Sequence, residues 1–339
     1  MLHISDRDLH VKAALHTHST SSDGKLAPKD VVDFYKNHGY GVVALTDHNK
    51  ITRIEVKDFD DPLVIQGMEI SKGRSALEEP YHLVVLGVED DSIARIGDLQ
   101  ELMDFVNRSG GIAILAHPHW SGLVYQDLIS IQGYAAMEIF NYGCEVEVSK
   151  GFALSSWDSL LSSGYRVWGV AVDDSHRYVF PPIDADGGWT VLLLRELNTD
   201  EVFKAIRSGG FYSSTGAVIK KLMVDGNYIE VATCSARRIT LISENGKGFS
   251  IGSDDVDWLI NNIGDVEKIK SVVDEIDIVR EGNRTIVVFT KNQTRISAVM
   301  DSNGIDLLTV DRFKWGRYLR VEVMDFQGGK AWSNPIASQ

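Results

Sequence analysis

Short runs of aliphatic and β-branched residues alternate with amphipathic segments from residue 11 to about residue 216. Apolar runs of this length are typical of buried strands, and the segments between them carry the apolar periodicity of helices. A chain that alternates strands and helices forms a parallel sheet covered by helices, and many such units in one domain favour a barrel over an open sheet. The predicted strands are residues 11–15, 41–45, 63–66, 83–87, 112–116, 136–140, 167–172 and 190–194.

The predicted helices have recognisable ends. The segment 28–38 begins with Pro28, at a position where the first turn tolerates proline, and is followed by Gly39. Proline at the start and glycine just past the end is the usual asymmetry of helix termini. The other predicted helices are residues 98–108, 156–163 and 198–207.

The pattern changes after Gly216, where alternating polar and apolar runs are separated by turn signals such as Asp225-Gly226-Asn227. This pattern predicts a second domain. We therefore expect an α/β barrel over residues 1–216 and an all-β, sandwich-like domain over residues 217–339. Its predicted strands include residues 228–233, 239–243, 285–290, 296–300 and 318–324, and the acidic stretch 252–277 predicts either a short helix or an inserted loop.

Composition is that of a globular protein with a small-molecule partner. The 339 residues are 44% hydrophobic and 24% charged, which suits a chain that buries a core. Asp plus Glu outnumber Lys plus Arg by 48 to 34, and the net charge of −14 repels nucleic acid and anionic lipid. Bound cations would invert this field locally, so an anionic small substrate remains possible.

The cysteines and the apolar runs point to the cytoplasm. Cys144 and Cys234 lie far apart and form no CxxC pair, which favours a reducing compartment. The first residues show no basic segment followed by an apolar one, and no apolar run reaches the length of about 18 residues that a membrane span requires. We expect a cytoplasmic protein without a membrane partner, and the sequence leaves its oligomeric state open.

Histidines and carboxylates follow the apolar runs one after another. Imidazole and carboxylate groups are the usual ligands of Zn, Mn and Fe ions, and two or three such ions need about eight or nine groups in one cavity. Residues i and i+2 of a strand share a face, so His16 with His18, and Asp174 with His176, can each reach one ion. Glu69 is the predicted bridge between two ions. The predicted metal ligands are His16, His18, Asp23, His48, Glu69, His82, His117, Asp174 and His176.

Adjacent acidic residues compete for some of these roles. Asp47 directly precedes His48, so the two side chains diverge, and we expect only His48 to face the cavity. Asp173 and Asp174 compete in the same way, and the i, i+2 relation to His176 selects Asp174.

Several positions keep a structural alternative. Asp23, within Ser-Ser-Asp-Gly, could stabilise a turn instead of binding metal. His82 begins its predicted strand instead of ending it, so it could be an interfacial histidine. Trp120, Trp168 and Trp189 could line the mouth of the cavity, but packing at strand ends is the simpler interpretation.

Candidate substrate contacts follow from charge and position. Arg177 and Arg74 could hold a phosphate, although both could equally be surface residues. Glu138 and Asn141 could orient substrate, support the ligands or add polarity to the barrel. His119, two residues after His117, could contact substrate or face solvent.

The motifs together resemble a known family. Leu15-His16-Thr17-His18, Thr46-Asp47-His48-Asn49, Gly67-Met68-Glu69 and Ala116-His117-Pro118, with Ser22-Asp23-Gly24 and Asp174-Ser175-His176, are similar to the polymerase and histidinol phosphatase (PHP) superfamily over about residues 10–216. Where the histidinol phosphatase branch often has a third early histidine, this chain has Asp23. The resemblance implies a distorted (β/α)7 barrel with a two- or three-metal site at the strand ends and, in most members, phosphoester hydrolysis.

A second set of motifs resembles one branch of that superfamily. Met137-Glu138-Ile139-Phe140-Asn141 and Ala331-Trp332-Ser333-Asn334-Pro335, together with Tyr318-Leu319-Arg320-Val321-Glu322, are similar to the carbaryl-hydrolase-like (CehA/McbA) branch, which carries an appended β domain.

The expected function is hydrolysis of a small phosphoester by a metal-activated water at a site with two or three Zn, Mn or Fe ions. The expected catalytic residues are Glu69, His48, Asp174 and His176. An amide, ester or carbamate hydrolase with the same metal site is the first alternative. A nuclease is disfavoured by the net charge, and a metal-binding module without turnover is disfavoured because all nine positions are filled. The chain has no GxSxG elbow, no phosphate-cradling GxxxxGK[ST] loop and no dinucleotide-binding glycine motif.

Overall fold

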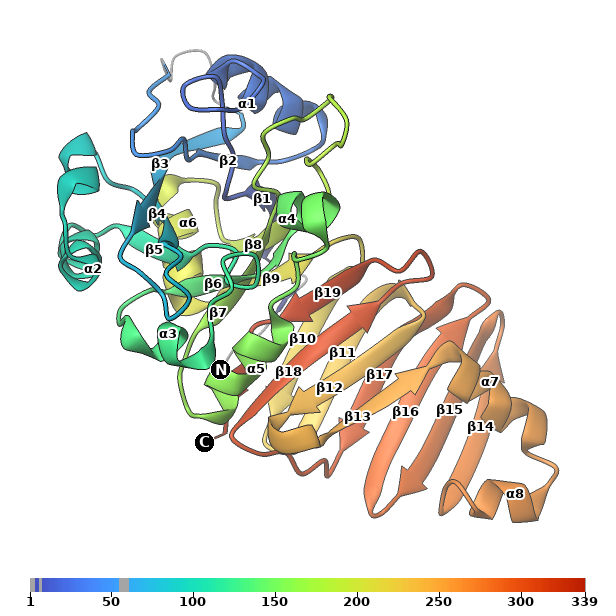
Figure 1. Cartoon of the computed structure of the whole chain (residues 1–339). Coiled ribbons are helices and arrows are strands. Elements are labelled where there is room, and N and C mark those ends of the chain that lie inside the picture. The colour runs from blue at the N-terminus through green and yellow to red at the C-terminus, as the bar shows by residue number, and fades with distance from the viewer. Residues whose placement is uncertain (1–3, 6–7, 55–60, 339) are drawn as a thin grey trace. The chain divides into compact units, whose positions relative to one another are not determined.

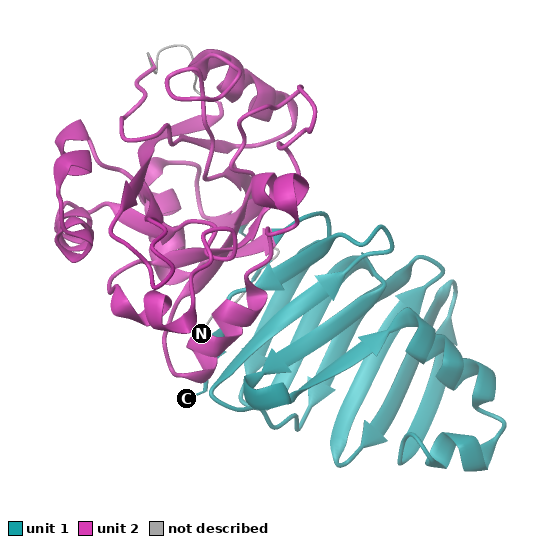
Figure 2. Cartoon of the chain, viewed as in Figure 1, with its two compact units in different colours: residues 1–8, 214–339 teal, residues 9–213 magenta. Residues whose placement is uncertain are grey.

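The computed structural model describes residues 4–5, 8–54 and 61–338 and divides the chain into two compact units (Figure 2). One unit is Leu9–Ser213, and the other combines Met1–Asp8 with Ser214–Gln339. Ile4 belongs with the second unit because its backbone amide and carbonyl both pair with Leu222, at 3.1 and 3.0 Å.

The first unit is a mixed α/β structure (Figure 1). The predicted strands and helices of this unit are present, and most agree with the prediction within two residues at their ends. The strand predicted over residues 63–66 continues to Lys72, and one strand (β9) and two short helices (α3 and α4) were not predicted. Its strands are β1 (Leu9–Ala14), β2 (Val42–Leu45), β3 (Leu63–Lys72), β4 (Tyr81–Leu86), β5 (Ile112–Leu115), β6 (Ala136–Asn141), β7 (Trp168–Val172), β8 (Trp189–Leu194) and β9 (Phe211–Ser214). Its α-helices are α1 (Pro28–Asn37), α2 (Leu99–Arg108), α3 (Tyr125–Ser130), α4 (Tyr142–Val148), α5 (Leu154–Ser162) and α6 (Thr199–Ser208).

Helix ends follow the expected chemistry. The side chain of Asp98 accepts a hydrogen bond from the backbone amide of Glu101 at the start of α2, and Asn198 does the same for Glu201 at the start of α6. Each cap satisfies one backbone donor that the first turn leaves unpaired. Gly209 ends α6 in the left-handed conformation, as a glycine at this position favours.

The strands of the first unit lie in the order β9-β8-β1-β2-β3-β4-β5-β6-β7. Strands β1, β2, β3, β5, β6 and β7 run in one direction, as expected for strands joined by helical crossovers. One core gathers alternate residues of this curved sheet around α6, including Leu15, Val84, Ile114, Val172 and Phe203. A second core lies between β1, β2 and α1.

The expectation of a wholly parallel sheet is wrong at two strands. β4 runs antiparallel to both β3 and β5, and β8 runs antiparallel to β1. Residues 73–80 are too few for the helical crossover that a parallel β4 would require, so the chain turns back directly. The start of β4 therefore lies at the same edge of the sheet as the ends of β3 and β5.

The second unit contains two sets of antiparallel strands, which confirms a β-rich region after the α/β unit, but it also contains two helices and is not all-β. The acidic stretch that left a choice between helix and loop forms α7 (Ser253–Asn262) and α8 (Val266–Lys270). One sheet has the order β10-β11-β17-β16-β15-β14, with β10 (Ile219–Asp225), β11 (Tyr228–Ala236), β14 (Glu275–Glu281), β15 (Arg284–Lys291), β16 (Thr294–Asp301) and β17 (Gly304–Asp311). The other includes β13-β12-β18-β19, with β20 beside β18, and comprises β12 (Arg238–Ser243), β13 (Gly248–Gly252), β18 (Tyr318–Met324), β19 (Lys330–Ser333) and β20 (Ile336–Ala337).

Within the part of the chain that the structure describes, no helix combines the length and the hydropathy needed to cross a membrane.

Candidate metal centre

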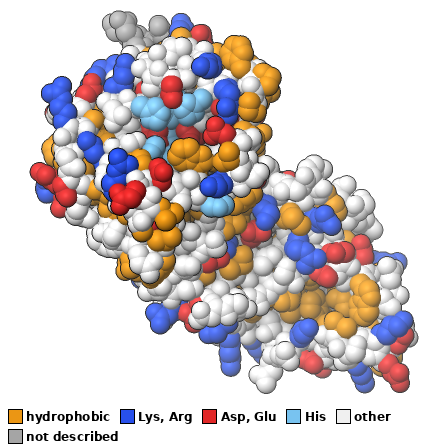
Figure 3. Space-filling view, viewed as in Figure 1, with side chains coloured by type: hydrophobic (Ala, Val, Ile, Leu, Met, Phe, Trp, Pro, Cys, Tyr) orange, Lys and Arg blue, Asp and Glu red, His pale blue; other side chains and the backbone are white. Residues whose placement is uncertain are grey.

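All nine predicted ligands meet in the first unit. They form three overlapping groups in which the candidate ligand atoms of each group lie within 4.8 Å of one another. A patch of histidine side chains is visible on the surface of this unit, beside acidic and hydrophobic side chains (Figure 3). The groups are His16, His18, Glu69 and Asp174; Glu69, His82 and His117; and His18, Asp23, His48 and His176.

The first group is buried and its polar atoms converge. Nε2 of His16 and Nε2 of His18 lie 3.1 Å apart, and each lies within 3.2 Å of Oδ1 of Asp174. Oδ1 of Asp174 is buried, and apart from imidazole nitrogens it has no polar partner among the described residues. A buried carboxylate oxygen without a partner is costly unless a cation or proton lies against it. This group therefore fits a divalent ion.

The charges of this group stabilise one another. Burial lowers the pKa of His18, but Asp174 and Glu69 outweigh it and raise that pKa to about 9. Burial raises the pKa values of Asp174 and Glu69, but neighbouring imidazoles, chiefly His16, outweigh it and hold both well below their ordinary values. The carboxylates are thus ionised, and together they create the negative potential that a cation requires.

Glu69 lies between two of the groups. Its Oε1 is 2.7 Å from Nδ1 of His82 and 3.1 Å from Nε2 of His117. Its Oε2 faces the other side, 3.4 Å from Nε2 of His18 and 3.0 Å from Nδ1 of His48. Each oxygen therefore faces a different set of imidazoles, as a bridging carboxylate requires.

The reversal of β4 explains how His82 reaches this site. His82 lies opposite Ser71 of β3, and its carbonyl accepts a hydrogen bond from the backbone amide of Ala116 just after β5. Because β4 is antiparallel, its first residues share an edge with Glu69 and His117. The position of His82 at the start of its strand is thus the position that brings it into the second group.

The third group is open to solvent. Asp23 is 57% exposed at its side chain, and its two oxygens lie 3.4 Å from Nε2 of His176 and 3.5 Å from Nε2 of His48. His18 stacks on His176 with ring centres 4.1 Å apart, but its Nε2 points into the buried group. One imidazole bridges two ions only after losing both ring protons. The third group therefore depends on Asp23, His48 and His176.

Glu138 and Asn141 are both buried and form hydrogen bonds with candidate ligands. The Glu138 carboxylate accepts hydrogen bonds from Nδ1 of His16 and from the backbone amide of His117, both at 2.7 Å. The side-chain amide of Asn141 donates to Glu138 at 2.8 Å and to Asp174 at 3.1 Å. The first contact of Glu138 turns Nε2 of His16 toward the cavity, and the second holds the backbone of His117. Together they support the second of the roles left open for this pair.

The two acidic neighbours of the ligands point away from the groups. Asp47 accepts hydrogen bonds from the hydroxyl groups of Ser19, Ser22 and Thr52 and so pins the loop after His18. Asp173 accepts from the backbone amides of residues 186–188 and from Tyr35. Burial raises the pKa of Asp173 to about 6 although these donors oppose the shift.

The remaining candidate substrate contacts are not gathered into the cluster. Arg177 lies 3.3 Å from Asp184 and donates to the carbonyl of Pro182. Arg74 donates to the carbonyl of Glu78, and His119 is exposed and belongs to none of the three groups formed by described residues. A substrate role for these three residues stays a prediction.

Comparison with known proteins gives a match in fold. No family model matches the chain, and no curated protein matches it. A two-domain protein of Bacteroides vulgatus, described as containing a predicted PHP-like metal-dependent phosphoesterase, is 13% identical and matches 99% of this chain and 98% of its own, with a TM-score of 0.51. This chain shares its fold.

Two further solved structures show weaker similarity. A candidate metal-dependent phosphoesterase of Bifidobacterium adolescentis is 14% identical over 59% of this chain and 96% of its own, with a TM-score of 0.40. An amidohydrolase of Chromobacterium violaceum with bound sulfate is 16% identical over 50% of this chain and 92% of its own, with a TM-score of 0.35.

Sequence reasoning missed the hydroxyl groups that orient the histidines. Oγ of Ser121 lies 3.1 Å from Nδ1 of His117, and Oγ of Ser71 lies 3.2 Å from Nε2 of His82. Serine is too common in turns and strand ends to signal such a role, and the spacing of Ser121 four residues after His117 is informative only once the turn is known.

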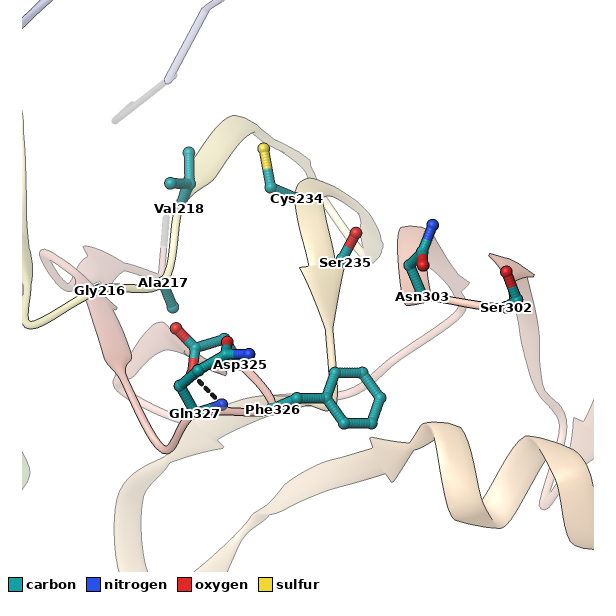
Figure 4. Close-up of a pocket in the computed structure, with 10 residues that line it drawn as sticks. All are labelled: Gly216, Ala217, Val218, Cys234, Ser235, Ser302, Asn303, Asp325, Phe326 and Gln327. Atoms are coloured by element: carbon teal, nitrogen blue, oxygen red, sulfur yellow. Dashed lines mark hydrogen bonds between the residues drawn. The ribbon is translucent and has the colours of Figure 1, made fainter.

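A cavity of about 530 Å³ in the second unit was also not expected (Figure 4). One carboxylate oxygen of Asp325, which lines the cavity, already accepts hydrogen bonds from the backbone amides of Gln327 and Gly329. The cavity is a feature of the second unit and contains none of the nine predicted ligands. Its lining residues are Gly216, Ala217, Val218, Cys234, Ser235, Ser302, Asn303, Asp325, Phe326 and Gln327.

Proposed function

We propose that this chain is a metal-dependent phosphoesterase of the PHP type that hydrolyses a small phosphorylated molecule. The observation that carries the proposal is that nine imidazole and carboxylate side chains converge into three overlapping groups. Glu69 belongs to the first and second groups, and His18 belongs to the first and third. A site that holds two or three ions side by side suits phosphoryl transfer, in which negative charge develops on several oxygens. The PHP-like description of the Bacteroides vulgatus protein that shares this fold supports the same class.

The residues on the buried side of the site have a different proposed role from those on its open side. Bound Zn, Mn or Fe ions would supply Lewis acidity and a water of lowered pKa. His16, His18, Glu69 and Asp174 would hold them on the buried side, where Glu138 orients His16.

The open side is left for substrate. His48 and His176 are partly exposed there, so either imidazole could pass a proton to the departing oxygen when it holds no ion, and an ion-bound water would do so when both hold one. Glu69, His48, Asp174 and His176 are therefore the proposed catalytic residues.

The finer features belong to the same proposal. They comprise a distorted (β/α)7 barrel over residues 1–216, a sandwich-like domain over residues 217–339, membership of the carbaryl-hydrolase-like branch and a cytoplasmic location. The net charge of −14 supports a small substrate over nucleic acid.

The test combines metal analysis with a substrate panel. Protein purified without chelator is assayed for Zn, Mn and Fe and then for turnover of phosphate monoesters, phosphodiesters, carboxylic esters and carbamates. His16→Ala and Glu69→Ala are expected to lose bound metal and phosphatase turnover together. His38→Ala is the matched control, because His38 is exposed and belongs to none of the groups among the described residues.

Two results would contradict the proposal. Full turnover by metal-depleted Glu69→Ala protein would remove the metal site from the mechanism. Turnover of carbamates or carboxylic esters, with none of any phosphoester, would assign the same site to carbonyl chemistry.

A further inference from the structure

Trp120 is an exposed aromatic side chain beside the candidate ligands. Its ring lies edge-on to His117, with ring centres 5.1 Å apart, and edge-on to His82 at 6.1 Å. It nevertheless remains 41% exposed. Tryptophan is usually well covered in folded proteins, so one that borders a polar cluster and keeps this much surface open is available to a ligand.

The position of Trp120 is tied to that of His117. The backbone amide of Ser121 donates to the carbonyl of His117 at 3.1 Å, and that of Leu123 donates to Pro118 at 2.9 Å. The hydroxyl group of Ser121 lies 3.1 Å from Nδ1 of His117. The turn that aims the imidazole into the cluster therefore also places the indole at its border.

Further apolar side chains surround this turn. Leu77 and Val124 are exposed, and a Cβ atom at Gly122 would lie 3.3 Å from the side chain of Leu77. Asp127 holds the two segments together, because its carboxylate accepts from the backbone amides of Ala76 and Val124. An exposed apolar group fastened to a polar site in this way marks a binding surface.

We propose that Trp120 forms the wall that receives the non-phosphate part of the substrate, so that the site selects phosphate esters of aromatic alcohols. The inference rests on the proposed function, because it assumes that the phosphate lies at the metal cluster. A group esterified to that phosphate must then lie beside the cluster, where Trp120 borders His117 and His82. The guanidinium groups of Arg74 and Arg177 already contact groups of their own loops. Neither arginine therefore indicates that the substrate carries a second anionic group.

Two pairs of ligands test the inference. Benzyl and methyl phosphate are both esters of simple alcohols and differ mainly in the aromatic ring. Benzylphosphonate and methylphosphonate are their analogues that resist hydrolysis, and calorimetry measures their binding without turnover. The variants are Trp120→Ala and Trp120→Phe, and Trp258→Ala is the matched control because Trp258 lies on α7 with a similar exposed fraction of 40%.

We expect Trp120→Ala to lower kcat/KM for benzyl phosphate and the affinity for benzylphosphonate by about two- to tenfold, the range for an aromatic contact. The methyl ligands, the bound metal and the Trp258→Ala variant should be unchanged, and Trp120→Phe should retain most of the preference. An equal loss for benzyl and methyl ligands, or loss of metal from Trp120→Ala, would overturn the inference and make Trp120 a structural support of His117.

The inference and the proposed function fail in different ways. If wild-type protein hydrolyses both phosphates and Trp120→Ala leaves their ratio unchanged, the function stands and the role of Trp120 is refuted. If no phosphate is hydrolysed but benzylphosphonate binds in a manner that depends on Trp120, the function is refuted and the aromatic wall stands.

Discussion

Glu138 accepts a hydrogen bond from Nδ1 of His16 at 2.7 Å, and both side chains are buried. Because Nδ1 is engaged in this way, Nε2 is the nitrogen that His16 turns toward Glu69 and Asp174. The second oxygen of Glu138 accepts from the backbone amide of His117 and from Asn141. One carboxylate thus orients the imidazole of His16 and holds the backbone of His117, candidate ligands from two of the three groups.

We expect Glu138→Gln to weaken metal binding about 10- to 100-fold, the usual effect of removing such a support. The glutamine amide would accept from only some of its present donors, and its NH2 group would face another donor. The measurement is titration with metal in competition with a chelating dye. Glu147→Gln, at an exposed glutamate of the same region, is the control, and equal affinity of both variants would refute the supporting role of Glu138.

Asp47→Asn is predicted to destabilise the loop that carries His18. Burial raises the pKa of Asp47, but hydrogen bonds from Ser22, Thr52 and Ser19 outweigh it and lower the pKa below 3.8. A carboxylate with a lowered pKa stabilises the fold above its ordinary value, and this contribution disappears as the pH falls through the lowered pKa. We expect Asp47→Asn to lose about 1–3 kcal/mol of unfolding free energy at pH 7.

Urea unfolding of wild type and Asp47→Asn at several pH values measures this effect. The difference should persist between pH 7 and pH 5 and shrink below pH 3.8, the ordinary value for this carboxyl. Asp257→Asn, at an exposed site on α7, should show no comparable loss. A difference that is the same at every pH would show that lost packing, and not the ionised carboxylate, is responsible.

The strand ends explain why the ligands could be predicted from sequence. His16, His48, His117 and Asp174 each follow an apolar run, and parallel strands bring such ends to one edge. The role of His82 as a ligand was ambiguous because the apolar pattern of a strand does not indicate whether the strand runs parallel or antiparallel to its neighbours. The short segment 73–80 was the available signal for its reversal, since it is too short for a helical crossover.

The supporting contacts could not be predicted in the same way. The bond between His16 and Glu138 joins residues 122 positions apart, and it depends on how the fold brings the segment after β1 close to β6. The exposure of a side chain is equally hard to predict: the sequence left open whether Trp120 lines the mouth of the cavity or packs at a strand end, and the structure leaves it 41% exposed. The pattern of polar and apolar residues predicts where a side chain lies along a strand or helix. The orientation and exposure of that side chain depend on how distant segments pack against it.

Metal binding is predicted to release protons. Asp174 and Glu69 raise the pKa of His18 to about 9 against the effect of its burial, so His18 is protonated at pH 7.5 in metal-free protein. A bound ion must displace this proton, and, against the effect of burial, the neighbouring carboxylates also raise the pKa values of His16 and His117. Affinity should therefore rise with pH by at least about tenfold per unit until pH approaches 9. Calorimetry in two buffers of different ionisation enthalpy measures the number of protons released.

The matched control for proton release is His38→Ala, which should release as many protons as wild type because His38 lies on the surface. Heats that do not depend on the buffer would show that His18 is already neutral before the metal binds and would contradict the prediction.

The three groups are predicted to differ in metal affinity because they differ in burial. His16, His18, Glu69 and Asp174 are enclosed, whereas Asp23 is 57% exposed at its side chain. Solvent screens an exposed carboxylate and competes for its ion, so the group of Asp23, His48 and His176 should release its ion first. Asp23→Ala should then lower the number of bound ions by one at limiting free metal, with the buried group still filled.

Metal counting after equilibration with chelator-buffered solutions of increasing free metal gives the order in which the ions are lost. Asp104→Ala, at an exposed site of α2, serves as the control. If Asp23→Ala and Asp174→Ala lost the same number of ions at the same free metal, the ions would bind as one cooperative set, and burial would not rank the sites.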